Sequence, residues 1–296
     1  MYKTDLKVAF AFRKCLVFRH LRYRYLRYSE TMAELEFNRH VTETMSNITD
    51  TRILALPLMN SPLYVIFISF AYWYTVYVFG PYFMKDRKPY SLKGFIQCYN
   101  IFQIVTNFWI VFNIVTNGGP FAAVWNYCEP FDQICGANSE KQIEILWWGL
   151  CLKIVDLIET VIFVLRKKVN QLSFLHTYHH LSTVVFFWVL IRYFIHGFLT
   201  TIAMLNCSVH VIMYLYYFLS TFGPNMQRRL LPFKKYLTLI QMGHIAFIFT
   251  YSLRGIAPNC GDETVKYFTL ITFLNGSINF LCFLNFYKSY KKAKTA

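Results

Sequence analysis

Three histidines lie within a stretch that otherwise resembles a membrane helix, FLHTYHHLSTVVFFW at residues 174–188. In a hydrocarbon core, a polar group without a hydrogen-bond partner costs on the order of several kcal/mol. Neutral imidazole can ligate a metal ion, attack a carbonyl carbon or accept a proton near neutral pH. His176, His179 and His180 share one arc of a helix, and we therefore expect them to take part in chemistry.

Three further apolar segments carry polar residues at helical spacing. At about 100° per residue, the polar residues of each segment fall on one side of a helix. Ionisable groups inside membrane segments indicate functional sites, so we expect all four helices to face one interior cavity. The residues are Lys153, Asp156 and Glu159 in LKIVDLIET, Asn206, His210, Tyr214 and Tyr217 in NCSVHVIMYLYY, and Gln241 and His244 in TLIQMGH.

Part of this set has a structural alternative. A buried histidine or glutamine often joins helices without doing chemistry, and this stays open for Gln241 and His244. Lys153 and Asp156 are close enough in sequence to form a simple charge pair. Three histidines in five residues, with His210 in a second segment, favour a functional role more strongly.

Two chemistries suit the histidine cluster. Membrane di-iron desaturases and hydroxylases use an HxxHH box as one of three histidine-rich boxes, whereas this chain has one such box and eight histidines in all. Acyl transfer needs only an imidazole that attacks or accepts a proton. A seven-helix receptor or transporter is a further alternative, although it gives no reason for the polar stripes.

The elements that position these residues are membrane helices. Of the 296 residues, 56% are hydrophobic and 15% are charged, against about 25% charged in a soluble domain. Because about 20 apolar residues cross a hydrocarbon core, the sequence predicts an all-α integral membrane protein whose seven transmembrane helices form a bundle around a buried catalytic cavity. The expected spans are 62–84, 95–116, 144–165, 174–191, 197–219, 236–254 and 266–287.

Basic residues predict the orientation of the bundle. Lysines and arginines are concentrated in loops 85–93, 166–168 and 228–235 and in the tail, which the positive-inside rule assigns to the cytosol. The N-terminus is then lumenal and the C-terminus cytosolic. Since topology explains the net charge of +15, we expect no nucleic-acid partner.

The two ends of the chain lie outside the expected helical domain, residues 61–288. Residues 1–60 form a basic segment that is either an amphipathic helix on the membrane surface or a flexible extension, with a glycosylation sequon at Asn47. The tail, residues 289–296, ends in KAKTA, where Lys292 and Lys294 match a retrieval signal for the endoplasmic reticulum membrane.

The cysteines of the expected lumenal loops are candidates for a disulfide. Cys128, Cys135 and Cys260 lie in these loops, and an oxidising lumen allows one bridge among them.

These motifs together resemble the ELO family of very-long-chain fatty acid elongases, the 3-oxoacyl-CoA synthases. KIVDLIET, HTYHH, NCSVHVIMYLYY and TLIQMGH follow the order and separations of the family motifs over roughly residues 60–290. Two departures are visible: Asp156 precedes Glu159 where the family has the reverse order, and His244 stands where the family usually has glutamine. Neither removes a histidine of the box.

The resemblance implies an acyltransferase that condenses long-chain acyl-CoA with malonyl-CoA into 3-oxoacyl-CoA, CO2 and CoA, without a metal or other cofactor. It implies that His179 is the nucleophile and forms an acyl-histidine intermediate. Donors to the thioester oxygen and proton carriers are then expected among His176, His180, Asn206 and His210. Lys153, Asp156 and Glu159 complete the catalytic set, with the carboxylates orienting imidazoles.

The resemblance also implies binding sites for both CoA substrates. Cations bind phosphate, so Arg166, Lys167, Lys168, Lys234 and Lys235 are expected at the cytosolic entrance, unless they only set topology. Tyr214, Tyr217, Gln241 and His244 are expected beside the substrate, and the acyl tail in the apolar interior toward the lumenal end.

The family's Cys-x-Pro-x-Asp segment is matched by YCEPFD, which makes Cys128–Cys260 the preferred disulfide and Cys128–Cys135 the alternative. Membrane lipid and other enzymes of the elongation cycle are expected partners. The oligomeric state is left open by the sequence, with a homodimer among the options.

Overall fold

The computed structural model describes residues 50–261 and 263–295, with side chains up to residue 288. The expectations for residues 1–49 of the basic N-terminal segment, for Asn47 and for the side chains of Lys292 and Lys294 lie outside this description. Residues 50–296 form one unit, and every regular element in its described part is a helix.

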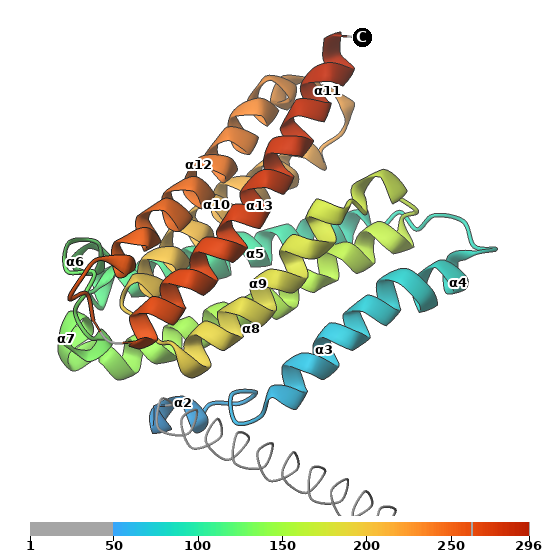
Figure 1. The fold of residues 1–296 in the computed structure, drawn as a ribbon. Helices are drawn as coiled ribbons and strands as arrows, with labels where there is room; N and C mark the ends of the chain where they lie inside the picture. The colour runs from blue at the N-terminus through green and yellow to red at the C-terminus, as the bar shows by residue number, and fades with distance from the viewer. Residues whose placement is uncertain (1–49, 262, 296) are drawn as a thin grey trace, which may run out of the picture. The chain divides into compact units, whose positions relative to one another are not determined.

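The helices follow one another through short connections (Figure 1). They are α2 (Thr51–Leu54), α3 (Pro62–Tyr74), a π-helical turn (Thr75–Phe79), α4 (Gly80–Met84), α5 (Lys93–Thr116), α6 (Pro120–Trp125), α7 (Phe131–Cys135), α8 (Ser139–Leu165), α9 (Phe174–Tyr193), α10 (Phe198–Ser220), α11 (Pro224–Leu230), α12 (Lys234–Ser252) and α13 (Glu263–Thr295). Single turns of 3-10 helix lie at Gly136–Asn138, Val169–Gln171, Leu231–Phe233 and Leu253–Ile256.

Six helical stretches of the described chain are long and apolar enough to cross a membrane. They are Pro62–Met84, Lys93–Thr116, Phe174–Tyr193, Phe198–Ser220, Pro224–Ile256 and Glu263–Lys288. The remaining expected span, 144–165, lies within α8, which has sufficient length but carries Lys153, Asp156 and Glu159 in its central part. The protein is therefore an all-helical, multi-pass membrane protein.

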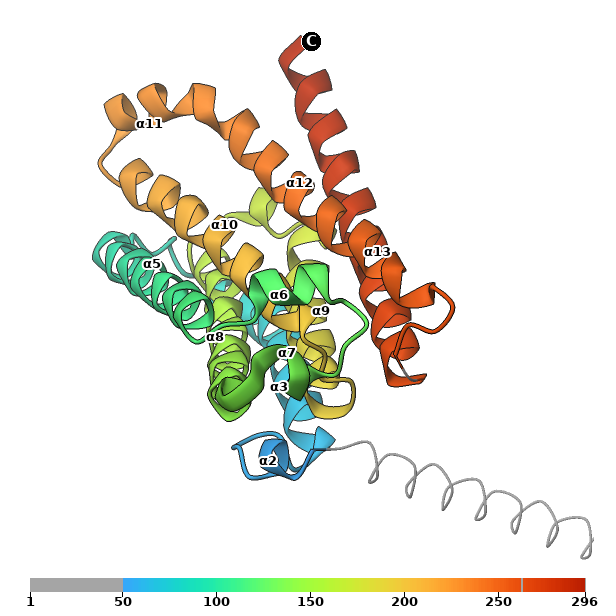
Figure 2. The ribbon, with the colours of Figure 1, turned by 90° about the vertical axis from the view of Figure 1, so that its left-hand side faces the viewer.

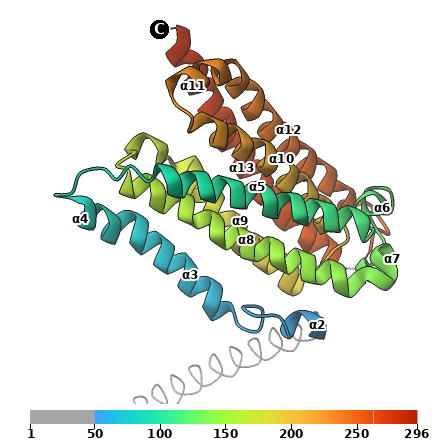
Figure 3. The ribbon, with the colours of Figure 1, turned by 180° about the vertical axis from the view of Figure 1, so that it is seen from behind.

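Six of the long helices pack in a closed sequence of neighbours. α8 lies beside α9, α9 beside α13, α13 beside α12, α12 beside α10, α10 beside α5, and α5 beside α8 (Figures 1 and 2). α3 lies outside this ring and contacts α9, whereas the π-helical turn and α4 contact α8 (Figure 3). The short basic connection at 166–173 places α8 and α9 as antiparallel neighbours.

The start of α9 is fixed by a side-chain cap. Ser173 precedes the first helical residue, and its Oγ accepts a hydrogen bond of 3.2 Å from the backbone N–H of His176. Such a cap contributes about 1 kcal/mol of helix stability. It fixes where the helical phase begins, and therefore the direction in which the following histidines point.

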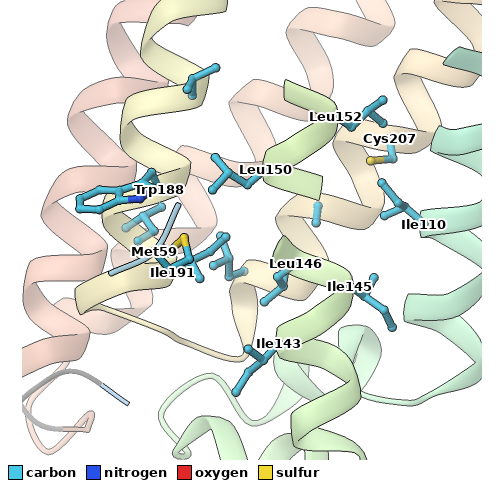
Figure 4. Packing of buried hydrophobic residues seen from close by; sticks show 14 of the residues in the cluster. Met59, Ile110, Ile143, Ile145, Leu146, Leu150, Leu152, Trp188, Ile191 and Cys207 are labelled. Atoms are coloured by element: carbon cyan, nitrogen blue, oxygen red, sulfur yellow. The ribbon is translucent and has the colours of Figure 1, made fainter. Parts of the chain in front are cut away.

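A hydrophobic core lies between the membrane helices (Figure 4). Leu146 and Leu150 from α8 pack with Trp188 and Ile191 from α9, and all four side chains are buried. The indole N–H of Trp188 donates a hydrogen bond of 2.9 Å to the carbonyl oxygen of Leu58. Within lipid, close packing and such hydrogen bonds hold helices together, because the hydrophobic effect adds little there.

The connections at the α6 and α7 end of the bundle are tied by a disulfide and by ion pairs. The disulfide joins Cys128 to Cys260, the pair that the resemblance favoured, and Cys135 is a free thiol. Arg52 in α2 forms ion pairs with Asp50 and, at 2.9 Å, with Asp132 in α7. Hydrogen bonds from Arg52 lower the pKa of the Asp50 carboxyl below its usual value.

Candidate functional site

The polar stripes of α8, α9, α10 and α12 face one pocket of about 670 Å3. Its wall includes most of the residues that the sequence analysis singled out for catalysis. From that set it holds Glu159, His176, His179, His180, Asn206 and His210, whereas Lys153 and Asp156 do not line it. It also holds Tyr217, Gln241 and His244, which were expected beside the substrate. The four helices belong to the ring, so residues that are distant in sequence come together there.

The three box histidines occupy about one turn of α9. The rings of His176 and His180 lie 4.2 Å apart between centroids, and the His179 ring lies 5.7 Å from that of His180. On its other side, His179 meets the ring of Phe283 from α13 at 6.0 Å. His179 makes no side-chain hydrogen bond within the described part of the chain, so its nitrogens are available to a substrate.

A charge pair on α8 connects to a histidine on α10. Lys153 Nζ donates to Asp156 Oδ2 at 3.0 Å and lies 3.4 Å from Nδ1 of His210. An ammonium group only donates, so His210 accepts at Nδ1 and carries its proton at Nε2. The pair anticipated from the sequence is thus also a device that sets the tautomer of His210.

Asp156 is fixed further by two residues from other helices. Its Oδ1 accepts a hydrogen bond of 2.7 Å from Gln103 Nε2 and one of 3.3 Å from the hydroxyl of Tyr214. Gln103 lies on α5 and is fully buried. Its role was not predicted from the sequence, although Asn100, Gln103 and Asn107 recur at helical spacing in the second expected span and indicate a fifth polar stripe.

Two more contacts link α8 to the histidine box. Glu159 Oε2 lies 3.7 Å from Nε2 of His180. The hydroxyl of Thr160 lies 3.0 Å from Nε2 of His176 and is itself hydrogen bonded to the hydroxyl of Tyr72 at 2.9 Å. Tyr72 comes from α3, outside the ring, and no sequence pattern pointed to it.

A second, apolar pocket of about 120 Å3 adjoins the first. Phe186, Leu190, Ile202 and Ile248 form much of its wall. The two pockets share His179, Asn206 and His244. Oδ1 of Asn206 is buried without a hydrogen-bond partner in the described structure, and a donor on a bound ligand would satisfy it.

The expected substrate-binding cations divide into two groups. Lys234 lies in the wall of the polar pocket, and Arg166 lines a neighbouring pocket that shares Glu159 and Tyr217 with it. The other three cations do not line these pockets: Lys167 Nζ donates to the Lys85 carbonyl oxygen at 3.3 Å, Lys168 is exposed, and Lys235 lies 4.7 Å from the ring centre of Tyr236.

Two of the expected lining residues have partners within the protein. Tyr214 is fully buried and bonds Asp156, so it supports the acid instead of lining the pocket. Gln241 Nε2 lies 3.3 Å from Met213 Sδ, although the side chain still lines the polar pocket.

Comparison with known proteins assigns the chain to a family. The sequence model of the ELO (GNS1/SUR4) family matches residues 57–296. "Very long chain fatty acid elongase 1" of Mus musculus is 36% identical over 247 residues, which cover 83% of this chain and 88% of the relative. The Homo sapiens protein of that name is 37% identical over the same shares, and "Very long chain fatty acid elongase 4" of Macaca mulatta is 35% identical over 84% of this chain and 78% of its own length.

This similarity decides against a di-iron oxidase and against a receptor or transporter. The chain belongs to the ELO family, the condensing enzymes of very long chain fatty acid elongation.

Proposed function

We propose that this chain condenses a long-chain acyl-CoA with malonyl-CoA and that His179 holds the acyl group between the two half-reactions. The observation that supports this role is the place of His179 in the wall of both pockets. A polar pocket suits the CoA ends of the substrates, and an apolar pocket suits an acyl tail. The thioester carbon would then lie where the two meet, beside His179.

In the first half-reaction, a ring nitrogen of His179 attacks the thioester carbonyl carbon. The carbon–sulfur bond breaks, CoA leaves as the thiolate, and the acyl-imidazole remains after a proton is lost. Neutral imidazole needs no prior deprotonation to attack, and this covalent step divides one difficult reaction into two easier ones. Donors such as Asn206 and the N–H groups of neighbouring histidines would stabilise the developing oxyanion.

In the second half-reaction, malonyl-CoA loses CO2 and the electron pair of the broken bond becomes an enolate. The enolate carbon attacks the acyl-imidazole carbonyl, and His179 leaves as 3-oxoacyl-CoA forms. Both halves are carried by the two substrates and by side chains, so the route uses no cofactor. The apolar wall around His179 excludes the water that would otherwise hydrolyse the intermediate.

Lys153 and Asp156 on α8, together with His210 on α10, supply a fixed hydrogen-bond donor for this chemistry. Since Nδ1 of His210 accepts from Lys153, the free N–H of His210 is at Nε2. His210 lies in the wall of the polar pocket. We therefore assign His210 as a hydrogen-bond donor to a thioester oxygen, with Lys153 and Asp156 holding its orientation.

Lys234 and Arg166 are the cations placed to meet CoA phosphates, because they line the polar pocket and its neighbour. Tyr217, Gln241 and His244 would contact the bound substrate from α10 and α12. Lys167, Lys168 and Lys235 would act at longer range, by raising the positive potential around the entrance.

We propose that α8 is the seventh membrane span of an endoplasmic reticulum protein. Its three ionisable residues face the ring interior, where pairing lowers the cost of burying them. With the basic loops cytosolic, the N-terminus and the Cys128–Cys260 disulfide lie on the lumenal side, where disulfides are stable. Residues 1–60 would act at that surface and residues 289–296 as a retrieval tail.

The nucleophile is tested with two histidine variants of the purified enzyme. Wild-type protein, His179→Ala and His176→Ala are incubated with radiolabelled acyl-CoA alone, and protein-bound label and released CoA are measured. We expect bound label in the wild type, a slower accumulation in His176→Ala, and none in His179→Ala. Label on His179→Ala at the wild-type level would assign the acyl group to another residue.

The condensation itself is tested with radiolabelled malonyl-CoA and a panel of acyl-CoA chain lengths. The expected product is a labelled 3-oxoacyl-CoA whose formation depends on both substrates. If no chain length gave product in membranes that contain the folded protein, the proposed reaction would be wrong.

A further inference from the structure

A chain of two hydroxyl groups connects α3 to the histidine box. The Tyr72 hydroxyl lies 2.9 Å from Thr160 Oγ1, which lies 3.0 Å from Nε2 of His176. Tyr72 is 6% exposed and Thr160 is fully buried. Water is therefore kept away from both hydroxyls, and each proton needs a partner within the protein.

The direction of these hydrogen bonds follows from counting protons. Neither hydroxyl has another hydrogen-bond partner among the described residues, and Thr160 does not bond the carbonyl one turn before it, as Thr106 and Thr250 do. Only one arrangement uses both protons: Tyr72 donates to Thr160, and Thr160 donates to His176. His176 then accepts at Nε2 and carries its own proton at Nδ1.

The π-helical turn explains how one helical segment contacts both α8 and α9. Tyr72 precedes the turn, and Tyr77, within it, donates a hydrogen bond of 2.9 Å to Thr177 Oγ1. Residues five apart in an α-helix point about 140° apart. A π-helical turn bonds residue i to residue i+5 and brings them toward one side, as these two contacts require.

Gly80 allows the turn to lie close to α8. A Cβ atom added there would lie 2.5 Å from the Thr75 carbonyl oxygen and 2.6 Å from Val164 Cγ1. No side chain fits at those distances. The glycine at position 80 therefore allows the turn to pack directly against α8, the helix that carries Thr160.

We propose that Tyr72 is a positioning residue that acts through Thr160 to hold His176 in its Nδ1–H tautomer, so that His176 works as a hydrogen-bond donor and not as a base at Nε2. This inference rests on the proposed condensation, in which oxyanions form in the pocket that His176 lines. Fixed donors aimed at a developing oxyanion stabilise the transition state strongly. Tyr72 itself touches no substrate.

The test compares Tyr72→Phe with Tyr77→Phe. Each variant loses one hydroxyl from the same segment and one hydrogen bond of the same length, but only Tyr72 connects to an imidazole. We expect Tyr72→Phe to lower kcat by about tenfold to a hundredfold, somewhat less than the loss of an oxyanion donor. KM for both CoA substrates should stay within about twofold, because binding contacts are unchanged. Tyr77→Phe should keep kcat within about twofold of the wild type, since it touches no imidazole.

A spectroscopic measurement separates this inference from the proposed reaction. Nitrogen NMR of protein labelled with 15N-histidine distinguishes Nδ1–H from Nε2–H, and the His176 signal is identified by its loss in His176→Gln. We expect Nδ1–H in the wild type and in Tyr77→Phe, and a mixture in Tyr72→Phe. Thr160→Ser, which keeps the hydroxyl, should retain the Nδ1–H form, and Thr160→Val should lose it.

Two results would overturn the inference whatever reaction the enzyme performs. One is an Nε2–H tautomer at His176 in the wild type. The other is an equal loss of kcat in Tyr72→Phe and Tyr77→Phe with equal melting temperatures, because both residues would then only hold α3 in place. Failure of the acyl-transfer assays with an intact Nδ1–H signal would instead count against the proposed condensation alone.

Discussion

Gln103 on α5 donates a hydrogen bond of 2.7 Å to Asp156 on α8, and neither side chain is accessible to solvent. Gln103 Nε2 also lies 2.9 Å from the Tyr99 hydroxyl, and its Oε1 accepts from Asn107 Nδ2 at 3.0 Å. One glutamine therefore connects a row of polar groups on α5 to the acid that pairs with Lys153.

Gln103→Leu is expected to lower activity without touching the substrate. The variant removes the shortest hydrogen bond to Asp156, which keeps Lys153 and Tyr214, and it removes a side-chain partner from the Tyr99 hydroxyl and from Asn107. A polar group left unpaired in a buried site costs about 1–3 kcal/mol. We expect kcat to fall by about tenfold or more and the melting temperature to drop. Activity is measured with saturating substrates, and unfolding is followed in detergent.

Gln97→Leu is the matched control for this change. Gln97 lies on the same helix and donates a bond of 3.0 Å to Thr221, but it does not bond Asp156. Its loss should change kcat by less than about twofold. Equal losses of kcat in the two variants would show that Gln103 acts only by holding α5 in place.

The Lys153–Asp156 pair should behave as a coupled unit. Removing one partner of a buried ion pair leaves an uncompensated charge and costs about 3–5 kcal/mol, whereas removing both is far less costly. We expect Lys153→Met to destabilise the protein strongly and Lys153→Met with Asp156→Asn to recover much of that loss. Thermal unfolding of the two single variants and the double variant gives the coupling energy.

Activity measurements on the same variants distinguish a structural role of the Lys153–Asp156 pair from a catalytic one. The double variant should remain inactive even where its stability recovers, because His210 loses the ammonium that fixes its tautomer. A stable and active double variant would make the pair purely structural.

The helical segments were predictable because their signal is local. Apolar runs of sufficient length predicted each long helix, and helical spacing predicted which side chains share a face. His179, Asn206 and His210 come together because each lies on the interior side of its own helix. The periodicity of polar residues along each helix was therefore enough to predict most of the residues of the site.

Contacts between helices could not be predicted from the sequence where they depend on how far one helix is shifted or rotated relative to its neighbour. Tyr72 bonds Thr160 in a segment that continues as a π-helical turn, and the sequence of that turn, TVYVF, contains no residue pattern that predicts it. Lys167 and Arg166 are adjacent cations with the same expected role, yet of the two only Arg166 lines the pocket that adjoins the polar pocket. The difference arises from the end of α8, where Lys167 takes a left-handed backbone conformation, φ 51°.

The apolar pocket should determine the preferred length of the acyl chain. Leu190 lies eleven residues after His179 on α9, about 16 Å along the helix, and lines the pocket. Leu190→Ala opens space at that depth. Each methylene newly buried gains about 0.8 kcal/mol, so two should raise the relative kcat/KM of a longer acyl-CoA by about tenfold. Product profiles from a panel of acyl-CoA lengths measure the shift.

Val189→Ala removes a neighbouring branched side chain that does not line the pocket, and it should leave the profile unchanged. If both variants shifted the profile, or neither did, the acyl tail would lie elsewhere.

Cys135 should resist alkylation although it lies close in sequence to a disulfide. It is a free thiol and 6% exposed, and burial raises its pKa to about 12 from 9.0. The reactive form is the thiolate, whose fraction falls tenfold for each unit by which the pKa exceeds the pH, so folding lowers it by about a thousandfold. Labelling should therefore stay slow from pH 7 upward and accelerate only as the pH approaches the raised pKa or when the protein unfolds.

Iodoacetamide labelling followed by non-reducing peptide mapping measures both parts of this expectation. Native protein should give an unlabelled Cys135 peptide and a peptide pair joined through Cys128 and Cys260, whereas denatured protein should label Cys135 fully. Cys128→Ser provides the control, since it frees Cys260 as a thiol without changing Cys135. Rapid labelling of Cys135 in the folded wild type at pH 7.5, or a peptide joining it to Cys128, would contradict the buried thiol and the disulfide together.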